Sequence, residues 1–279
     1  MRVWLWLGAL SVALGLFVAA RPSNGPPLRA PARIDGLWVW TRADAALLAQ
    51  SHVMRPGLVP GVLVASVVAR PDGTLALRRG LSPAAVTGEL ALVVRLEDSL
   101  HARMGAPDAV ARDLEPRLGE LMAEVRATGA RVQEVQLDYD APVRRLGEWA
   151  AVVRKLRRGV LSGVPLWVTS IPAHVADREY GNLFRGLVDG HILQLFDTGL
   201  LCSPAQASRI ESELERARMP FRLGVATYER MRRGRVTTAH ACWRRATAEL
   251  ARTPGFAGTW LFPAGRDPRA ALADLEVTR

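Results

Sequence analysis

Cysteine and lysine are nearly absent from this chain of 279 residues. It has two cysteines, Cys202 and Cys242, and one lysine, Lys155. Two cysteines cannot form a zinc site by themselves, and they exclude a scaffold held by several disulfides. A single bridge between them is compatible with an oxidising compartment, and two small buried thiols are the alternative.

Because lysine is scarce, arginine carries almost all of the positive charge, and the net charge is +10. A basic chain can contact nucleic acid, anionic polymers or membrane surfaces. No basic run is interleaved with aromatic residues, as binding of single-stranded nucleic acid would require. We therefore expect no nucleic-acid partner, and residues 230–235 are interpreted as a solvated loop or helix face.

The motifs of several enzyme classes are also missing. His174 and His191 are isolated, without the close histidine spacing of metal sites. There is no glycine-rich phosphate loop and no G-x-S-x-G elbow. The sequence thus predicts no resident metal, no cofactor and no serine or cysteine nucleophile.

Residues 1–20 have the features of an export signal. Arg2 precedes an uncharged apolar stretch, residues 3–20, that ends in small residues suited to signal cleavage. The stretch is long for a signal peptide and marginal for a membrane span, so a retained inner-membrane anchor is the alternative. Residues 21–33 are a Pro/Gly linker, which leaves residues 34–279 as the folded domain. The expected location is periplasmic or secreted.

Strand patterns alternate with helix patterns from residue 34 onward. Eight strand candidates occupy a body close to the roughly 250 residues usual for a (β/α)₈ TIM barrel. They are residues 36–41, 61–69, 90–96, 132–138, 166–171, 192–196, 222–227 and 258–262. Helix patterns at residues 109–125, 143–156, 210–217 and 239–251 separate several of them.

One interval departs from this rhythm. In residues 70–88, Pro71-Asp-Gly73 favours a hairpin, so the second βα unit is expected to be degraded. An open doubly wound sheet is disfavoured, because no glycine-rich turn follows the first strand. The predicted fold is a TIM barrel.

Residues 132–140 alternate with a period of two, which is typical of a strand. Glu134, Gln136, Asp138 and Asp140 share one face. Because Pro142 opens a helix pattern, the strand should pair in parallel, with both faces covered. A buried polar face is tolerated where it lines a cavity. Two carboxylates this close should raise the pKa of one and make it a candidate acid. The alternative is that one aspartate caps the following helix, as Asp140 could, and the other pairs with an arginine.

The segment 133–140 resembles the fourth-strand motif DxxDxDxE of chitinase-type (family 18) glycoside hydrolases. Asp138 matches the last aspartate, and Asp140 stands at the catalytic glutamate. Gln133 and Gln136 replace the two earlier aspartates. More closely, residues 34–265 resemble the bacterial domain-of-unknown-function family 3142, which is grouped with glycosidase-like barrels.

Two further segments carry the resemblance. Gln194-Leu-Phe196-Asp197 is similar to the sixth-strand M-x-Y-D of family 18, and Asp197 keeps its identity. Trp260 stands where that family places the tryptophan beneath the sugar. In family 18 the acid is a glutamate, and the substrate's own acetamido group is the nucleophile. The Asp140 side chain is one methylene shorter than that glutamate, so its carboxyl group reaches about 1–1.5 Å less far. A misplacement of this size can lower the rate roughly a hundredfold.

The resemblance implies hydrolysis of a polysaccharide or oligosaccharide. Asp140 would be the acid, Asp138 would stabilise charge or orient the nucleophile, and Asp197 would assist. The expected substrate-binding residues are Trp38, Trp40, Arg95, Glu97, Gln136, Gln194, Phe196, Tyr228 and Trp260. A surface pair of Arg95 with Glu97 and a core pair of Trp38 with Trp40 are structural alternatives. A non-catalytic carbohydrate-binding barrel is the competing function, and a cation held by Asp138 and Asp140 is a third.

Overall fold

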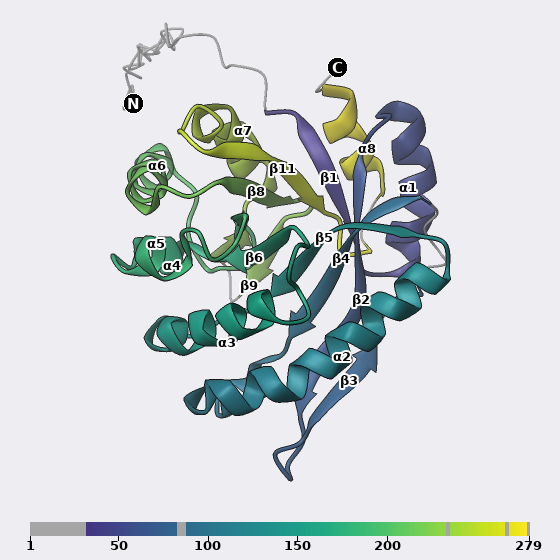
Figure 1. Ribbon diagram of the computed structural model, residues 1–279. Coiled ribbons are helices and arrows are strands. Elements are labelled where there is room, and N and C mark those ends of the chain that lie inside the picture. Colours follow the sequence, from purple (N-terminus) through teal and green to yellow (C-terminus); the bar gives the residue numbers. More distant parts are fainter. Residues whose placement is uncertain (1–31, 83–87, 233–234, 266–267, 278–279) are drawn as a thin grey trace, which may run out of the picture.

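The computed structural model describes residues 32–82, 88–232, 235–265 and 268–277. Within them, eight parallel strands form a closed ring with helices around it (Figure 1). Taken around the ring, they are β1 (Ile34–Val39), β2 (Val59–Ala69), β4 (Glu89–Leu96), β5 (Arg131–Asp138), β6 (Leu166–Ser170), β7 (Gly190–Gln194), β8 (Phe221–Ala226) and β11 (Phe256–Phe262). Each corresponds to one strand expected from the sequence, and the predicted (β/α)₈ barrel is confirmed.

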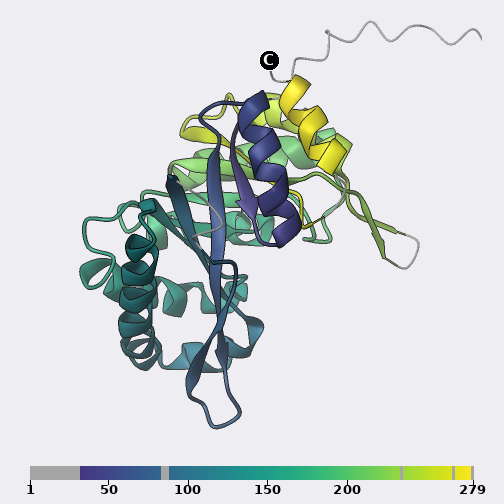
Figure 2. The same cartoon turned by 90° about the vertical axis from the view of Figure 1, so that its right-hand side faces the viewer.

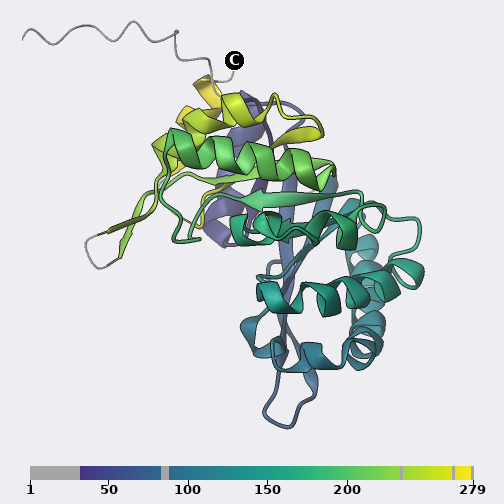
Figure 3. The same ribbon diagram turned by 90° about the vertical axis from the view of Figure 1, so that its left-hand side faces the viewer.

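The helices of the outer layer are α1 (Arg42–Met54), α2 (Pro107–Ala127), α3 (Leu146–Arg158), α4 (Pro172–Ala176), α5 (Tyr180–Phe184), α6 (Pro204–Ala217), α7 (His240–Leu250) and α8 (Pro268–Val277). The four helices expected from apolar spacing are α2, α3, α6 and α7. Three short 3₁₀ turns span Asp98–Leu100, Arg103–Gly105 and Val143–Arg145. Helices α3 to α6 cover one side of the barrel (Figure 3), while α1 and α8 lie together on another (Figure 2).

Helix α3 illustrates how the apolar pattern builds this layer. Leu146, Trp149, Val153 and Leu156 are buried and recur at three- and four-residue spacing. That spacing places them on one stripe, which packs onto the barrel strands as part of the continuous core between strands and helices. The helix ends at Arg158, and Gly159 follows as its C-cap.

The second βα unit is degraded, as predicted. The end of β2 pairs antiparallel with β3 (Leu75–Arg79), and residues 59–82 and 88–96 contain no helix. Arg70 N–H donates to Thr74 O at 2.8 Å, and Gly73 holds a φ of +81°, which glycine adopts without strain. Figure 2 shows this hairpin projecting from the barrel.

A second projecting hairpin was not expected. Strands β9 (Arg230–Arg232) and β10 (Arg235–Thr238) pair antiparallel between β8 and α7. The interpretation of residues 230–235 as a solvated loop or helix face is therefore wrong. The hairpin stands off the barrel in Figures 2 and 3, and Met231 on it is 67% exposed.

The interior of the barrel holds a buried ion pair within an aromatic layer. The Arg222 guanidinium donates to both oxygens of Glu134, at 2.5 and 2.9 Å. It also lies 3.7 Å from the Trp167 ring centroid and 5.4 Å from that of Trp260. These contacts compensate for the cost of burying a carboxylate. The polar face of β5 thus points into the barrel, as its alternation predicted.

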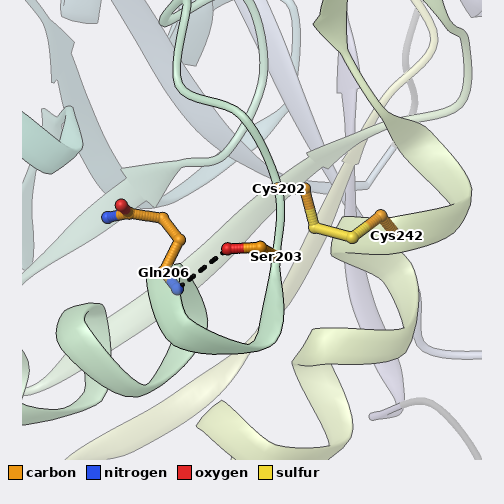
Figure 4. Close-up of a disulfide and its surroundings, with 4 residues drawn as sticks. All are labelled: Cys202, Ser203, Gln206 and Cys242. Atoms are coloured by element: carbon orange, nitrogen blue, oxygen red, sulfur yellow. Dashed lines mark hydrogen bonds between the residues drawn. A yellow bond between two sulfur atoms is a disulfide. The ribbon is translucent and has the colours of Figure 1, made fainter.

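Cys202 and Cys242 form a disulfide, with Cα atoms 6.1 Å apart (Figure 4). It ties the segment before α6 to the first turn of α7. Next to it, Ser203 Oγ accepts from Gln206 N–H at 3.2 Å and caps α6. Of the two outcomes that the sequence left open, the bridge is the one present.

Residues 1–20 and most of the linker 21–33 lie outside the described residues, so the export segment and the domain boundaries remain predictions. Among the residues that the structure describes, no helix has the length and apolar character to cross a membrane.

Candidate functional site

A pocket of about 280 Å³ opens at the carboxyl ends of the barrel strands. In (β/α)₈ enzymes this end carries the active site, because the βα loops meet there. The lining residues are Trp38, Trp40, Val93, Arg95, Asp138, Asp140, Thr169, Gln194, Phe196, Asp197, Tyr228, Arg230, Phe262 and Ala264.

Nine of the twelve site residues chosen from the sequence therefore line one pocket; Glu97, Gln136 and Trp260 are not among the lining residues. Gln136 precedes Asp138 by two positions on β5, which places it one layer deeper, where it is fully buried. Trp260 is 2% exposed and lies beneath Trp38, with ring centroids 5.6 Å apart. Glu97 lies outside the lining, with its Oε2 3.5 Å from Arg95 Nε.

Asp138 lies at the end of β5 and is 1% exposed. Its Oδ2 accepts from Arg95 Nη1 at 2.9 Å, and its Oδ1 accepts from Thr169 Oγ1 at 2.8 Å and Gln194 Nε2 at 3.1 Å. The donors come from β4, β6 and β7, so the closed sheet itself holds this carboxylate. Three donors, one of them charged, suit an ionised carboxylate that does not rotate.

Asp140 follows two residues later, at the mouth of the pocket. Its Oδ2 lies 3.6 Å from Arg95 Nη2, and its side chain is 37% exposed. Partial burial and the neighbouring charge of Asp138 raise the pKa of Asp140 to about 6, with Arg95 opposing the rise. No side chain caps the turn Val143–Arg145 or helix α3, so Asp140 is not a helix cap.

Aromatic rings supply much of the remaining wall. Phe196 and Phe262 stack with centroids 4.8 Å apart, and Trp40 packs edge-on against Phe262, also at 4.8 Å. Trp38 Nε1 donates to the buried Gln136 Oε1 at 2.8 Å, which anchors the ring beneath the pocket. Arg95 lies 5.5 Å from the Trp40 ring centroid. The Trp38 and Trp40 side chains are thus both packed in clusters and part of the lining.

Asp197 follows β7 and has a φ of +54°, a left-handed conformation that aspartate tolerates better than most residues. Thr238 Oγ1 lies 2.6 Å from its Oδ1, while Tyr228 Oη and Arg230 Nη1 lie 2.9 and 2.6 Å from its Oδ2. Asp197 N–H also bonds to Thr238 Oγ1 at 2.9 Å. This carboxylate therefore attaches the β9–β10 hairpin to the rim of the pocket.

Sequence reasoning missed five lining residues: Val93, Thr169, Arg230, Phe262 and Ala264. Thr169 could have been predicted as a pocket residue, because it is a polar residue near the end of a predicted strand. The pairing of Leu137 with Val168 brings it level with Asp138. Arg230 could not have been predicted in this way, because the hairpin that carries it was not recognised.

The chemistry of the pocket suits proton transfer more than metal binding. The Arg95 guanidinium contacts both Asp138 and Asp140, where a shared cation would otherwise sit. The described part of the chain contains no cluster of three or more His, Cys, Asp or Glu residues suited to a metal ion. Two carboxylates in different environments thus lie beside aromatic rings in one pocket.

The family follows from the sequence around this pocket. Residues 88–240 match the family described as "Domain of unknown function (DUF3142)". The chain belongs to the DUF3142 family. The matched segment includes Asp138, Asp140 and Asp197, together with the β9–β10 hairpin. No curated protein sequence matches the chain.

Solved structures that this DUF3142 chain resembles are glycoside-hydrolase-like TIM barrels. A chitinase from Rhizomucor miehei is 12% identical, with a TM-score of 0.56 over 88% of this chain and 100% of that one. The spore cortex-lytic enzyme SleL from Bacillus cereus is 12% identical, with a TM-score of 0.55 over 89% and 75%. A xylanase and alpha-amylase inhibitor protein from Scadoxus multiflorus is 11% identical, with a TM-score of 0.53 over 89% and 99%. At these identities the likeness concerns the fold.

Proposed function

We propose that this protein is an exported glycoside hydrolase that cleaves an envelope or extracellular polysaccharide with Asp138 and Asp140. One observation carries the proposal: the pKa of Asp140 is raised to about 6, beside an Asp138 that accepts three hydrogen bonds. A carboxyl group with a pKa of about 6 keeps a protonated fraction close to neutral pH and can act as a general acid, while a neighbouring carboxylate stabilises positive charge.

In this mechanism Asp140 donates its proton to the glycosidic oxygen as the bond to the anomeric carbon breaks. The departing sugar leaves as a neutral alcohol, and positive charge develops on the ring that stays bound. Asp138 stabilises that charge or orients the nucleophile, which is water or the substrate's own acetamido group, as it adds to the anomeric carbon. Water supplies the hydroxyl group of the released sugar, and its proton returns to Asp140. Arg95 contacts both carboxylates and holds them in place. Asp197 assists by holding the pocket wall that Arg230 and Tyr228 form.

Substrate binding would use the aromatic wall. The faces of sugar rings are apolar and stack on aromatic side chains, while their hydroxyl groups bond to polar residues at the edge. Trp40 and Phe196 supply the first kind of contact, and Gln194 and Arg95 supply the second. The glycoside hydrolases among the structural neighbours support a carbohydrate as the ligand.

Export has two supports. The apolar segment at residues 3–20 has the composition of a signal or anchor, and the Cys202–Cys242 disulfide suits an oxidising compartment. A periplasmic or secreted enzyme, with or without an N-terminal membrane tether, would meet polysaccharide there.

The test is a hydrolysis screen against a panel of polysaccharides, followed by variants on the best substrate. Asp140→Asn should abolish turnover and leave folding intact, whereas the exposed Asp108→Asn on α2 is the matched control and should turn over normally. Normal turnover by Asp140→Asn would refute the acid assignment.

A second candidate is a non-catalytic carbohydrate-binding barrel. It is favoured by the short reach of Asp140 and by the inhibitor protein among the structural neighbours. On that hypothesis no polysaccharide is hydrolysed, Asp140→Asn leaves glycan affinity nearly unchanged, and Trp40→Ala weakens it. Binding isotherms of these two variants on the same glycan separate the candidates.

A further inference from the structure

Four arginines surround a groove of about 310 Å³ on the outside of the barrel. Arg154, Arg157 and Arg158 come from the last turns of α3, and Arg185 follows α5. The two helices lie next to each other in Figures 1 and 3 and are in contact. Because each ends shortly before β6 or β7 begins, the groove lies at the amino-terminal end of the strands. It is therefore at the opposite end of the barrel from the pocket.

The charge of this groove is poorly compensated. No aspartate or glutamate is among its lining residues. Asp189, beside it, pairs with Arg157, with Oδ2 3.2 Å from Nη2. Within the described ranges, no carboxylate forms an ion pair with Arg154, Arg158 or Arg185, and all three side chains are exposed. Like charges gathered in a concave site repel one another and favour an anion between them.

Two of the guanidinium groups are already oriented by the backbone. Arg185 Nε and Nη2 both donate to Ala217 O, at 3.3 and 3.1 Å. Arg157 Nη1 donates to Val164 O, in the turn that follows α3. Side chains fixed in this way lose less conformational entropy when a ligand binds, so the groove is partly preorganised.

We propose that this groove binds the acidic groups of an anionic polysaccharide and is a second carbohydrate site, distinct from the pocket. The planar fork of arginine matches the two oxygens of a carboxylate or the oxygens of a phosphate. No aromatic residue lines the groove, so a polymer would be held there through its acidic groups and not by ring stacking. This disfavours the base stacking used for single-stranded nucleic acid. Its concave form fits a polymer strand better than a flat lipid surface.

Bound there, an acidic polymer leaves the pocket mouth open, since the two sites are at opposite ends of the barrel. The protein could thus stay attached to the polymer while the pocket acts on the same or another chain. That the ligand is a carbohydrate rests on the function proposed above, whereas the anion site rests on the arginines alone.

The experiment measures binding of the full-length protein to polygalacturonate at low and high salt. Dextran serves as a neutral polymer and phosphatidylglycerol vesicles as an anionic lipid surface. The groove variant is Arg154→Ala/Arg158→Ala. Its matched control is Arg112→Ala/Arg126→Ala, which removes the same charge from exposed positions on the neighbouring helix α2.

The groove variant should bind polygalacturonate roughly tenfold more weakly, and the control less than about twofold more weakly. Wild-type binding should fall as salt rises, because the contacts are between charges. Equal losses in both variants would show a general charge effect and overturn the site. Tight binding to vesicles but not to polygalacturonate would overturn the choice of ligand.

A further arm separates this site from the proposed hydrolase. Asp140→Asn should bind polygalacturonate through the groove as tightly as wild type does, whatever its activity. Wild-type protein that hydrolyses a polysaccharide but does not bind polygalacturonate would overturn the groove proposal alone. Wild-type protein that binds polygalacturonate through the groove but hydrolyses no polysaccharide would overturn the hydrolase proposal alone. Unchanged thermal melting of both arginine pairs checks that the fold is retained.

Discussion

The guanidinium of Arg95 contacts both carboxylates at the end of β5. Its Nη1 lies 2.9 Å from Asp138 Oδ2, and its Nη2 lies 3.6 Å from Asp140 Oδ2. The two acids nevertheless have different surroundings, because Asp138 is 1% exposed and bonded to three donors while Asp140 opens to the pocket mouth. This difference supports the acid role that we propose for Asp140, and four predictions depend on it or on the pocket wall.

The first prediction concerns pH and activity. If Asp140 is the general acid, it must be protonated, so kcat/KM should fall as pH rises through about 6. A pH–rate profile of wild type on its best substrate measures this alkaline limb. A flat profile from pH 5 to 8 would remove Asp140 from the mechanism.

The second prediction links the same group to stability. The pKa of Asp140 is raised in the folded state, so the folded protein binds the proton more tightly than the unfolded chain does, and its stability falls as pH rises from about 4 to about 6. Asp140→Asn removes this loss and should stabilise the protein at pH 7 by roughly 1 kcal/mol, a value reduced for partial exposure.

Urea denaturation of wild type and Asp140→Asn at pH 4 and pH 7 measures that effect. The difference between the two proteins should be larger at pH 7 than at pH 4. A difference in stability that is the same at pH 4 and pH 7 would contradict the raised pKa.

The third prediction concerns Arg95. Arg95→Gln removes the charge that opposes the rise in the pKa of Asp140, so the alkaline limb of the pH–rate profile should move to higher pH. Maximal activity should also fall, by roughly tenfold or more, because Asp138 loses a charged hydrogen bond. Arg95→Lys keeps the positive charge but loses the paired N–H donors of the guanidinium. In this variant the alkaline limb should return close to its wild-type pH, while the maximal activity should recover less. An alkaline limb at the wild-type pH in both Arg95→Gln and Arg95→Lys would contradict the role of Arg95 in setting the pKa of Asp140.

The fourth prediction concerns the wall formed by the β9–β10 hairpin. Asp197→Ala removes the acceptor that Thr238, Tyr228 and Arg230 share. Hydrogen exchange in residues 228–238 should become faster and KM should rise, while the pH–rate profile keeps its shape. A changed pH limb with unchanged exchange would mean that Asp197 acts in proton transfer instead. Thr238→Val, which breaks part of the same contact, should give a smaller effect in the same direction.

The disulfide gives a fifth prediction, independent of the chemistry. The Cys202–Cys242 bridge closes a loop with a sequence separation of 40 residues. Loop-closure entropy then predicts that Cys202→Ser/Cys242→Ser lowers the free energy of unfolding by about 3–4 kcal/mol. Urea denaturation of the variant, and of wild type with and without reductant, measures this. The variant should show no further loss on adding reductant.

The amino-acid sequence alone determined the class of fold and the strand that carries the acids. Eight apolar segments with helix patterns between them can bury their faces in few ways, and a closed parallel barrel is the one whose length fits. The two-residue period of Glu134, Gln136 and Asp138 likewise determined that these side chains share a face. The hairpin after Pro71 was readable for the same reason, because turn chemistry is local.

Tertiary structure decided which of these residues reach the pocket. How deep a side chain lies in the barrel depends on the stagger between neighbouring strands, and the sequence of one strand does not reveal that stagger. The sequence therefore could not show that Gln136 and Trp260 lie below the pocket instead of lining it. The contacts of Asp197 with Arg230, the bridge between two cysteines 40 residues apart and the raised pKa of Asp140 all depend on groups that meet only in the folded chain. Periodicity reports the direction of a side chain, whereas burial and charge environment are set by its neighbours in space.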